Sequence, residues 1–296
     1  MKIGILYSRI RRDEKLLLGE LRDRGHDVEK LDVRTLQFGL HGVSAGGVDV
    51  GDCDVVLDRC LATSRSLYAT KFLQHYGVPV VNAPETAETC ANKVKNSLAL
   101  DAADVPTPAT EVAFTSDAAL EIIERFGYPC VLKPVIGSWG RLMAKIDTRS
   151  AAEAVLEHKE TLGHYEHKVF YVQEFVEKPG RDVRVLACDG EPVAAMTRTS
   201  DHWLTNAAKG GETAAFDLDE EATELVEKAS AAVGGGLLGV DLMEVGGAGS
   251  GEYTVHEVNH TVEFKALDGC VDVDVPAAVV DWLELKADVA AEAAAV

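Results

Sequence analysis

The strongest constraint on the fold is a regular alternation of short apolar stretches with longer amphipathic ones in the first eighty residues. Strands are expected at residues 3–7, 27–31, 55–57 and 78–82, and helices at residues 13–24 and 64–76. Strands that alternate with helices form parallel sheets whose two faces are both covered. The sequence therefore predicts an α/β unit at the start of the chain.

After this unit the pattern includes antiparallel pairs. Helices are expected at residues 88–103, 116–126, 149–161, 220–233 and 276–289. Strands are expected at 130–133 and 143–146, in an antiparallel meander of 170–175, 183–188 and 192–198, and in a last hairpin of 238–244 and 253–258. The expected fold class is therefore α/β in its first part and α+β as a whole.

Charge excludes several classes of partner. Asp and Glu number 49 against 29 Lys and Arg, which gives a net charge of −20 at pH 7. Such a protein is unsuited to nucleic-acid backbones or anionic lipid, so we expect neither as a partner. No apolar run approaches the ~18 residues of a membrane span, and no secretory signal is recognisable, so a cytoplasmic protein is expected. Dispersed acidic residues also suit a salty cytosol, and we expect a halophilic source.

Several common site motifs are absent from the sequence. No GxGxxG follows the first expected strand, and the glycine-rich stretch 42–47 lacks the Gly-Lys-Ser/Thr ending of a P-loop. We expect that stretch to be a surface loop. The six cysteines show neither a CxxC pair nor a metal-binding spacing, which indicates buried thiols without a catalytic role.

Two lysines lie where a phosphate group could be held. Lys133 ends an expected strand and is followed by Pro134 and a loop of small residues, 137–141. Small residues let backbone N–H groups approach an anion, and a lysine beside them can anchor a phosphate. Lys93 lies on a preceding expected helix. For either lysine alone, the alternative is a solvated surface charge.

Three oxygen-bearing side chains lie on the last hairpin. Asp241 is on its first strand, and Glu257 and Asn259 are two residues apart on its second strand. Residues at i and i+2 of a strand share a face, so both can project toward Asp241. Three hard oxygen donors on rigid strands suit Mg²⁺. The alternative is a set of ordinary cross-strand polar contacts.

Residues 256–260 also match HExxH, a zinc-protease motif, and Glu284 could be a third ligand. That motif binds zinc on a helix, where histidines at i and i+4 share a face. The flanking residues are β-branched and aromatic, which favours a strand. A zinc hydrolase is therefore a remote alternative.

The order and spacing of these segments resemble the ATP-grasp ligase family over nearly the whole chain. The residues that carry the resemblance are Lys93, Lys133, Gly137, Ser138, Trp139, Gly140, Arg141, Gln173, Glu174, Phe175, Val176, Arg181, Asp182, Arg184, Asp241, Glu257 and Asn259, with residues 203–206, 210–211 and 260–265. The resemblance is strongest to the RimK-like branch, which contains ribosomal-protein glutamate ligases and the LysX and ArgX ligases. These last act on the amino-group carrier protein LysW.

The resemblance implies an N-terminal pre-ATP-grasp αβ domain (1–87), a central subdomain with a glycine-rich loop (88–168) and a C-terminal antiparallel-sheet subdomain with the metal site (169–296). ATP would lie between two antiparallel sheets, with its adenine near residues 173–176. Two Mg²⁺ ions are expected as cofactors. The family also suggests a homodimer or homotetramer.

The resemblance also assigns roles to residues. Those implied to bind the nucleotide are Lys93, Lys133, the loop 137–141, residues 173–176, Arg181 and Asp182, and those implied to hold magnesium are Asp241, Glu257 and Asn259. Arg184, Arg198 and Asn206 would bind phosphate and stabilise the intermediate as catalytic residues. A substrate carboxylate would attack the γ-phosphate, which gives an acyl phosphate and ADP, and an amine would then displace the phosphate.

By resemblance, the carboxylate belongs to the C-terminal glutamate of LysW. The amine belongs to glutamate in arginine biosynthesis or to 2-aminoadipate in lysine biosynthesis. In the family, Asn-Thr or Asn-Ala after the last Phe-Lys indicates aminoadipate and Gly-Phe indicates glutamate, whereas this chain has Ala266-Leu267. The acidic composition suggests a halophilic archaeon, and we expect that lineage to use the carrier for arginine. Glutamate is therefore favoured as the amine substrate. The alternatives are aminoadipate, another RimK-like peptide or protein glutamate ligase, and a nucleotide-binding regulator without catalysis.

Overall fold

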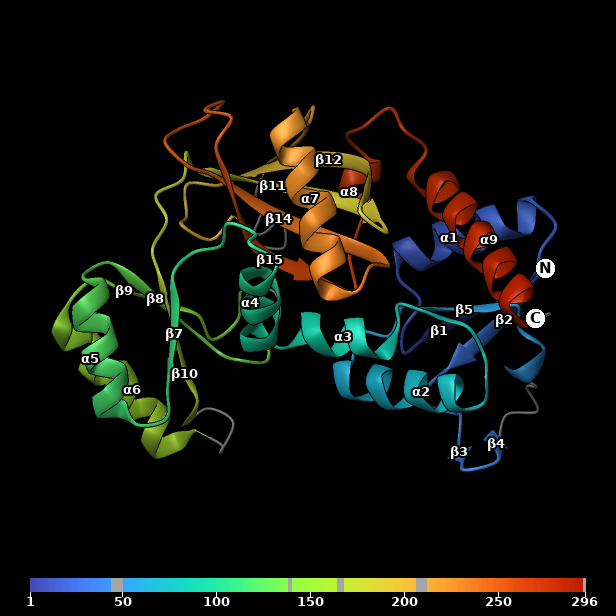
Figure 1. The fold of residues 1–296 in the computed structure, drawn as a ribbon, viewed down its shortest axis with the longest axis horizontal. Coiled ribbons are helices and arrows are strands. Elements are labelled where there is room, and N and C mark those ends of the chain that lie inside the picture. The colour runs from blue at the N-terminus through green and yellow to red at the C-terminus, as the bar shows by residue number, and fades with distance from the viewer. Residues whose placement is uncertain (44–49, 138–139, 164–167, 206–211, 295–296) are drawn as a thin grey trace.

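The computed structural model describes residues 1–43, 50–137, 140–163, 168–205 and 212–294. Three main sheets follow one another along the chain, and helices pack against each of them (Figure 1). A small hairpin of β3 (Phe38–Gly39) and β4 (Gly42–Val43) and a 3-10 turn at Val50–Asp52 were not expected. Of the glycine-rich stretch 42–47, residues 44–47 lie outside the described residues.

The first sheet is parallel, as the alternation predicted. Its order is β2 (Asp27–Asp32), β1 (Lys2–Tyr7), β5 (Val55–Asp58) and β6 (Val80–Val81), and its two connecting helices are α1 (Arg12–Asp23) and α2 (Thr63–His75). β6 is shorter than expected because neither residue before it donates an N–H to the sheet. The N–H of Val78 donates to the carbonyl of Leu73 at the end of α2 (3.0 Å), and Pro79 has no N–H.

The single helix expected at 88–103 is wrong, because the structure has α3 (Pro84–Ala91) and α4 (Lys93–Ala102) instead. The break falls at Asn92, whose side-chain oxygen accepts hydrogen bonds from two N–H groups of the first turn of α4 (3.0 and 3.2 Å). Asn is a favoured capping residue, so a new helix begins there. Lys93 is consequently the first residue of α4, and its N–H donates to the carbonyl of Val135 (2.9 Å), close to the glycine-rich loop.

The second sheet is antiparallel and has the order β7 (Thr110–Ala113), β10 (Phe170–Glu174), β8 (Cys130–Lys133) and β9 (Ala144–Ile146). The helices α5 (Ser116–Phe126) and α6 (Arg149–Leu162) pack on one face of it, at the left of Figure 1. The expected meander is therefore wrong in its first strand, since β10 pairs with β7 and β8. Phe170 and Val172 are buried in the apolar cluster beneath α5 and α6, and this packing fixes the sheet to which β10 belongs.

The third sheet is also antiparallel, with the order β13 (Glu212–Ala215), β12 (Glu191–Thr199), β11 (Arg181–Cys188), β14 (Leu237–Glu244) and β15 (Tyr253–Asn259). The helix α7 (Glu220–Val233) covers one face. The expected last hairpin is confirmed as β14 and β15. Asp241 lies opposite Glu257, but Leu242 lies opposite Val255, so His256 is an extra residue in β15 and forms a bulge.

The chain ends with α8 (Lys265–Asp268) and α9 (Val275–Ala294). α9 returns to the first unit and packs beside α1 (Figure 1). Arg24 contacts Asp281 (2.5 Å) and His26 contacts Glu284 (2.7 Å). A shared apolar cluster includes residues of β1, β5, β12 and α9, so the N-terminal and C-terminal parts have a common core.

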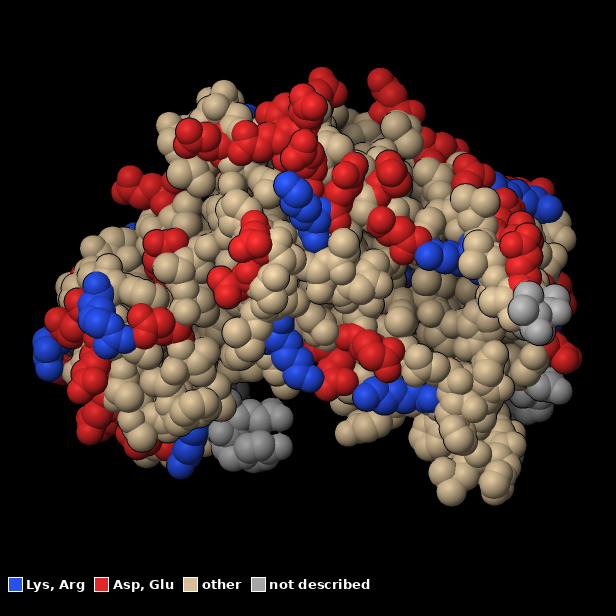
Figure 2. All heavy atoms as spheres, viewed as in Figure 1, with Lys and Arg blue, Asp and Glu red and all other residues tan. Residues whose placement is uncertain are grey.

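Acidic side chains spread over the face seen in Figure 2, with fewer basic ones among them. In the part of the chain that the structure describes, no helix has the length and apolar character needed to cross a membrane.

Candidate functional site

A cavity of about 360 Å³, the central cavity, lies between the second and third sheets. Its walls come from α4, the loop after β8, all five strands of the third sheet, and the start of α8 with the segment before it. The candidate site residues that line it are Lys93, Gly137, Gly140, Arg141, Asp182, Arg184, Arg198, Asp241, Glu257 and Asn259.

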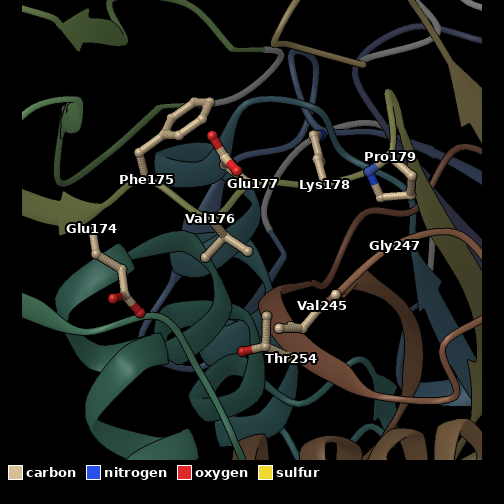
Figure 3. A pocket seen from close by; sticks show the side chains of 10 residues that line it. Glu174, Phe175, Val176, Glu177, Lys178, Pro179, Val245, Gly247 and Thr254 are labelled. Atoms are coloured by element: carbon tan, nitrogen blue, oxygen red, sulfur yellow. The ribbon is translucent and has the colours of Figure 1, made fainter.

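A smaller pocket adjoins the central cavity and shares Met143, Asp182 and His256 with it. Its lining includes six residues implied to bind the nucleotide: Lys133, Gln173, Glu174, Phe175, Val176 and Asp182. Outside this pocket lies a more open hollow of about 660 Å³ (Figure 3). The segment from Glu174 to Pro179 forms one side of this hollow, and Val245 and Thr254 lie on the other.

The structure brings the three expected metal ligands together. Asp241 and Glu257 lie opposite each other on neighbouring strands. The side-chain nitrogen of Asn259 is 3.3 Å from an oxygen of Asp241 and 3.3 Å from an oxygen of Glu257. A half-turn of the side-chain amide exchanges its oxygen and nitrogen positions. Asn259 can therefore equally present its oxygen here. The donor set fits a hard divalent cation such as Mg²⁺.

Cationic side chains surround these acids. Lys93 Nζ is 3.0 Å from Glu257 Oε2, and Arg184 holds both oxygens of Asp241, with one contact of 2.7 Å. Arg198 donates to Asp182 (2.6 Å) and to Asp241 (3.0 Å). The carboxylates of the site are therefore paired with its own cations. Lysine and arginine side chains of this kind can bind phosphate oxygens.

Lys133 is buried, with 2% of its surface exposed. Its ammonium group donates to Gln173 and lies 2.6 Å from His256 Nε2. Burial lowers the pKa of Lys133 to about 7, although the Glu257 carboxylate acts in the opposite direction. An anion bound beside this group would favour its charged form, which is the behaviour expected of a phosphate anchor.

The ionisation of Glu257 is set by its neighbours. Burial opposes its charge, but Lys93, His256 and Lys133 together hold its pKa well below the usual range. Burial lowers the pKa of His256 to about 3, and the charge of Lys133 acts in the same direction. The site therefore presents a carboxylate and a neutral imidazole at pH 7.

The zinc-hydrolase alternative is wrong because residues 253–259 form a strand rather than a helix. His256 faces Lys133, whereas the carbonyl of His260 accepts a hydrogen bond from Asn82 (2.7 Å). Glu284 is on α9, paired with His26. Among the described residues, no group of three or more His, Cys, Asp or Glu side chains could hold a metal.

One expected nucleotide contact lies elsewhere, and three cannot be placed. Arg181 makes two hydrogen bonds to Glu244 (2.6 and 2.8 Å) and does not line either pocket. Ser138, Trp139 and Asn206 lie outside the described residues. Arg141 lines the central cavity.

Two residues of the site, Lys178 and His256, were given no nucleotide or magnesium role by the sequence, and His256 was considered only as part of the zinc motif. Lys178 donates to Thr205 (2.7 Å) and lies 3.6 Å from Asp182, and burial lowers its pKa. His256 belongs to the site through the bulge in β15. Lys178 lies between Val176 and Arg181, two residues that carried the family resemblance, so this stretch of sequence was the available signal.

Lys133→Ala should weaken ATP binding by about tenfold to a hundredfold, because a buried charge-assisted contact is lost. The dissociation constant can be measured by calorimetry with ATP and Mg²⁺. Lys95→Ala is a suitable control, since Lys95 pairs with Glu88 at the surface, away from the cavity. Equal ATP affinity in Lys133→Ala and the wild type would contradict this role.

Comparison with known proteins agrees with this geometry. Residues 3–89 match the model of the LysX preATP-grasp domain, and residues 90–283 match the model of the RimK-like ATP-grasp domain. The chain is 32% identical over 266 residues to the alpha-aminoadipate–LysW ligase LysX of Sulfurisphaera tokodaii, covering 90% of this chain and 92% of that protein. It is 30% identical over 288 residues to the glutamate–LysW ligase ArgX of Sulfolobus acidocaldarius, covering 96% and 98%.

Solved structures give the same result. A RimK-domain ATP-grasp protein from Sphaerobacter thermophilus superposes with a TM-score of 0.78 at 29% identity, over 95% of this chain and 99% of that one. The ATP-grasp ligase PsnB, in complex with a minimal precursor, has a TM-score of 0.74 at 20% identity, which shows the fold alone. The chain therefore belongs to the RimK-like ATP-grasp family and is an ADP-forming acid–amino-acid ligase.

Proposed function

We propose that the protein joins the amino group of glutamate to the side-chain carboxylate of the C-terminal glutamate of LysW, in arginine biosynthesis. The observation that carries the proposal is the central cavity. There, Lys93 and the smaller pocket with Lys133 lie beside Asp241, Glu257 and Asn259. This arrangement of side chains suits the binding of a nucleoside triphosphate and a divalent cation next to a second substrate.

In this proposal the adenine lies near residues 173–176, and Lys93, Lys133 and the loop 137–141 hold the phosphates. Asp241, Glu257 and Asn259 would hold Mg²⁺, with two ions expected. When bound, Mg²⁺ would supply positive charge that offsets the charge of the transferred phosphoryl group. Further nucleotide contacts are proposed for Asp182, which lines both pockets, and for Arg181, whose guanidinium is paired with Glu244.

The chain's own residues would act by positioning and charge. The substrate carboxylate attacks the γ-phosphate, ADP leaves, and the amine then displaces phosphate from the acyl phosphate. Arg184 and Arg198, at the acidic end of the cavity, would stabilise the negative charge that develops, and Asn206 is proposed to assist them. No covalent enzyme intermediate is required.

Glutamate is proposed over 2-aminoadipate on the acidic composition, which suits a halophilic archaeon that uses the carrier for arginine. The relatives include ligases for each amino acid at similar identity. Of the pair Ala266-Leu267, Ala266 lines the central cavity and Leu267 is buried in the core, with 1% exposed. Only Ala266 is therefore placed to contact an amino acid. A cytoplasmic homodimer or homotetramer is also proposed.

The proposal can be tested by mass spectrometry of purified LysW after incubation with the enzyme, Mg-ATP and either glutamate or 2-aminoadipate. We expect a mass increase of one glutamyl residue, and an aminoadipyl increase would instead assign lysine biosynthesis. ADP release with amino acids alone, in the absence of LysW, would contradict the proposal that LysW is the carboxylate substrate. ATP binding without ADP release for any acid–amine pair would favour a regulator.

A further inference from the structure

We propose that Asp13 is a positioning residue for the amino-acid acceptor. It would hold residues 263–266, the wall segment, against the central cavity from the N-terminal unit. The wall segment contributes Glu263, Lys265 and Ala266 to the lining of that cavity. The inference rests on the proposed function in one respect, which is that an amino acid is the acceptor.

The main contact is a buried carboxylate that bridges two backbone groups. Asp13, in the first turn of α1, is 1% exposed. Its Oδ1 accepts hydrogen bonds from the N–H of Phe264 (2.7 Å) and the N–H of Lys265 (2.8 Å). These are the first groups of α8, and the N-cap residue Phe264 has no side-chain oxygen to cap them. Asp13 therefore supplies from a distant helix the cap that α8 lacks.

A second tether holds the residue before this contact. Arg11 Nη1 is 2.5 Å from Glu263 Oε1, and the same guanidinium donates to Glu14 (2.6 and 3.0 Å). Glu14 is fully buried and accepts from Arg59 Nε (3.2 Å). The guanidinium carbon of Arg59 lies 5.7 Å from the centre of the Phe264 ring. Three consecutive residues of the wall segment are thus each held by the N-terminal unit.

Joining two parts of a protein through this cluster costs stability, because it buries charged groups. Asp13 Oδ2 and both Nη atoms of Arg59 are buried and have no hydrogen-bond partner among the described residues. Unsatisfied buried polar groups destabilise a fold, and apolar packing would join the two parts without that penalty. A role in placing the wall segment accounts for charged groups at this position.

The cluster contacts the wall segment, the part of the cavity where we propose that the amino acid binds. It does not contact the two lysines proposed to bind ATP. Lys93 is fixed by its contact with Glu257, and Lys133 by Gln173 and His256. None of these contacts involves α1 or the wall segment. A shift of residues 263–266 should therefore change the fit of the amino acid while ATP binds as before. Misplacement of a bound group by about 1 Å is enough to lower rates substantially.

The test compares Asp13→Ala, Asp13→Asn and the control Asp23→Ala, which removes an exposed carboxylate from the other end of α1. In the LysW assay, Asp13→Ala should raise KM for the amino acid by about tenfold or more, with KM for ATP unchanged within about twofold. Asp13→Asn keeps an oxygen acceptor, so its KM for the amino acid should lie between those of Asp13→Ala and the wild type. Asp23→Ala should match the wild type.

Amide hydrogen exchange gives a readout that does not depend on activity. The amides of Phe264 and Lys265 should exchange faster in Asp13→Ala than in Asp23→Ala. Equal exchange at these amides, an unchanged amino-acid KM, or parallel rises in both KM values would each overturn the proposal. If Asp13→Ala does not fold, Arg11→Met removes the second tether from outside the cavity lining and should raise the amino-acid KM alone. A wild type that transfers no amino acid would refute the proposed function, while the exchange comparison would still decide the tether.

Discussion

Glu257→Gln should lower kcat by about a hundredfold or more while the protein stays folded. Gln has nearly the same shape as Glu, so the hairpin of β14 and β15 can form as before. The substitution removes the negative charge that Lys93 contacts at 3.0 Å and that faces Asp241 across the hairpin. A site that holds Mg²⁺ through Asp241, Glu257 and Asn259 would lose half of its carboxylate charge. Steady-state kinetics with Mg-ATP and saturating co-substrates measure the effect.

The metal role predicts a second change in the same variant. The Mg²⁺ concentration for half-maximal rate should rise, because one of two anionic ligands is gone. Glu252→Gln is the matched control, since Glu252 is an exposed carboxylate in the turn between the same two strands. It should keep the kinetics of the wild type. Wild-type turnover in Glu257→Gln, or an unchanged Mg²⁺ dependence, would remove Glu257 from the metal site.

The parts of the site that the sequence predicted are those that local geometry determines. The meeting of Asp241, Glu257 and Asn259 needs only two adjacent strands and the alternation of side chains along them. The first parallel sheet likewise follows from alternating periodicities. In both cases the local periodicity of the sequence is enough to predict which side chains or strands lie together.

Alternation along β11 also bears on the nucleotide contact expected of Arg181, which stays a prediction. Residues 182 and 184 share one face of that strand, and both line the central cavity. Arg181 shares the other face with Val183, which is buried in the cluster beneath α7. The family motif joined all of these residues into one candidate site, although their alternation separates Arg181 from the rest.

Other features depend on contacts that no local pattern specifies. The sheet that β10 joins is decided by the helices that cover Phe170 and Val172. The bulge at His256 overrides alternation, because His256 and Glu257 both line the central cavity although they are consecutive. The hydrogen bonds of Asp13 to Phe264 and Lys265 join residues about 250 positions apart. Such contacts become visible only in the folded chain.

Arg198→Met should destabilise the protein by about 3 kcal/mol at pH 7, because two buried carboxylates, Asp182 and Asp241, each lose one of their cationic partners. Arg198 is 6% exposed and donates to Asp182 (2.6 Å) and Asp241 (3.0 Å). Burial opposes its charge, but Asp241 and Asp182 hold the pKa of Arg198 above its ordinary value. Urea unfolding of wild type and variant in the same salt gives the difference. Arg125→Met is the matched control, since Arg125 and Glu111 form an exposed pair that should contribute far less.

The pH dependence separates loss of this charge from loss of packing. Burial would raise the pKa of Asp182, but Arg198, Lys178 and the hydrogen bond from Thr205 together hold that pKa below its ordinary value in the folded protein. A depressed carboxyl pKa contributes stability above the unfolded pKa, and that contribution disappears as pH falls through the folded pKa. The difference between wild type and Arg198→Met should therefore be largest near neutral pH and shrink below about pH 4. A difference that stayed constant across this range would mean that Arg198 stabilises the fold by its packing, and its charge would then be available to the phosphates alone.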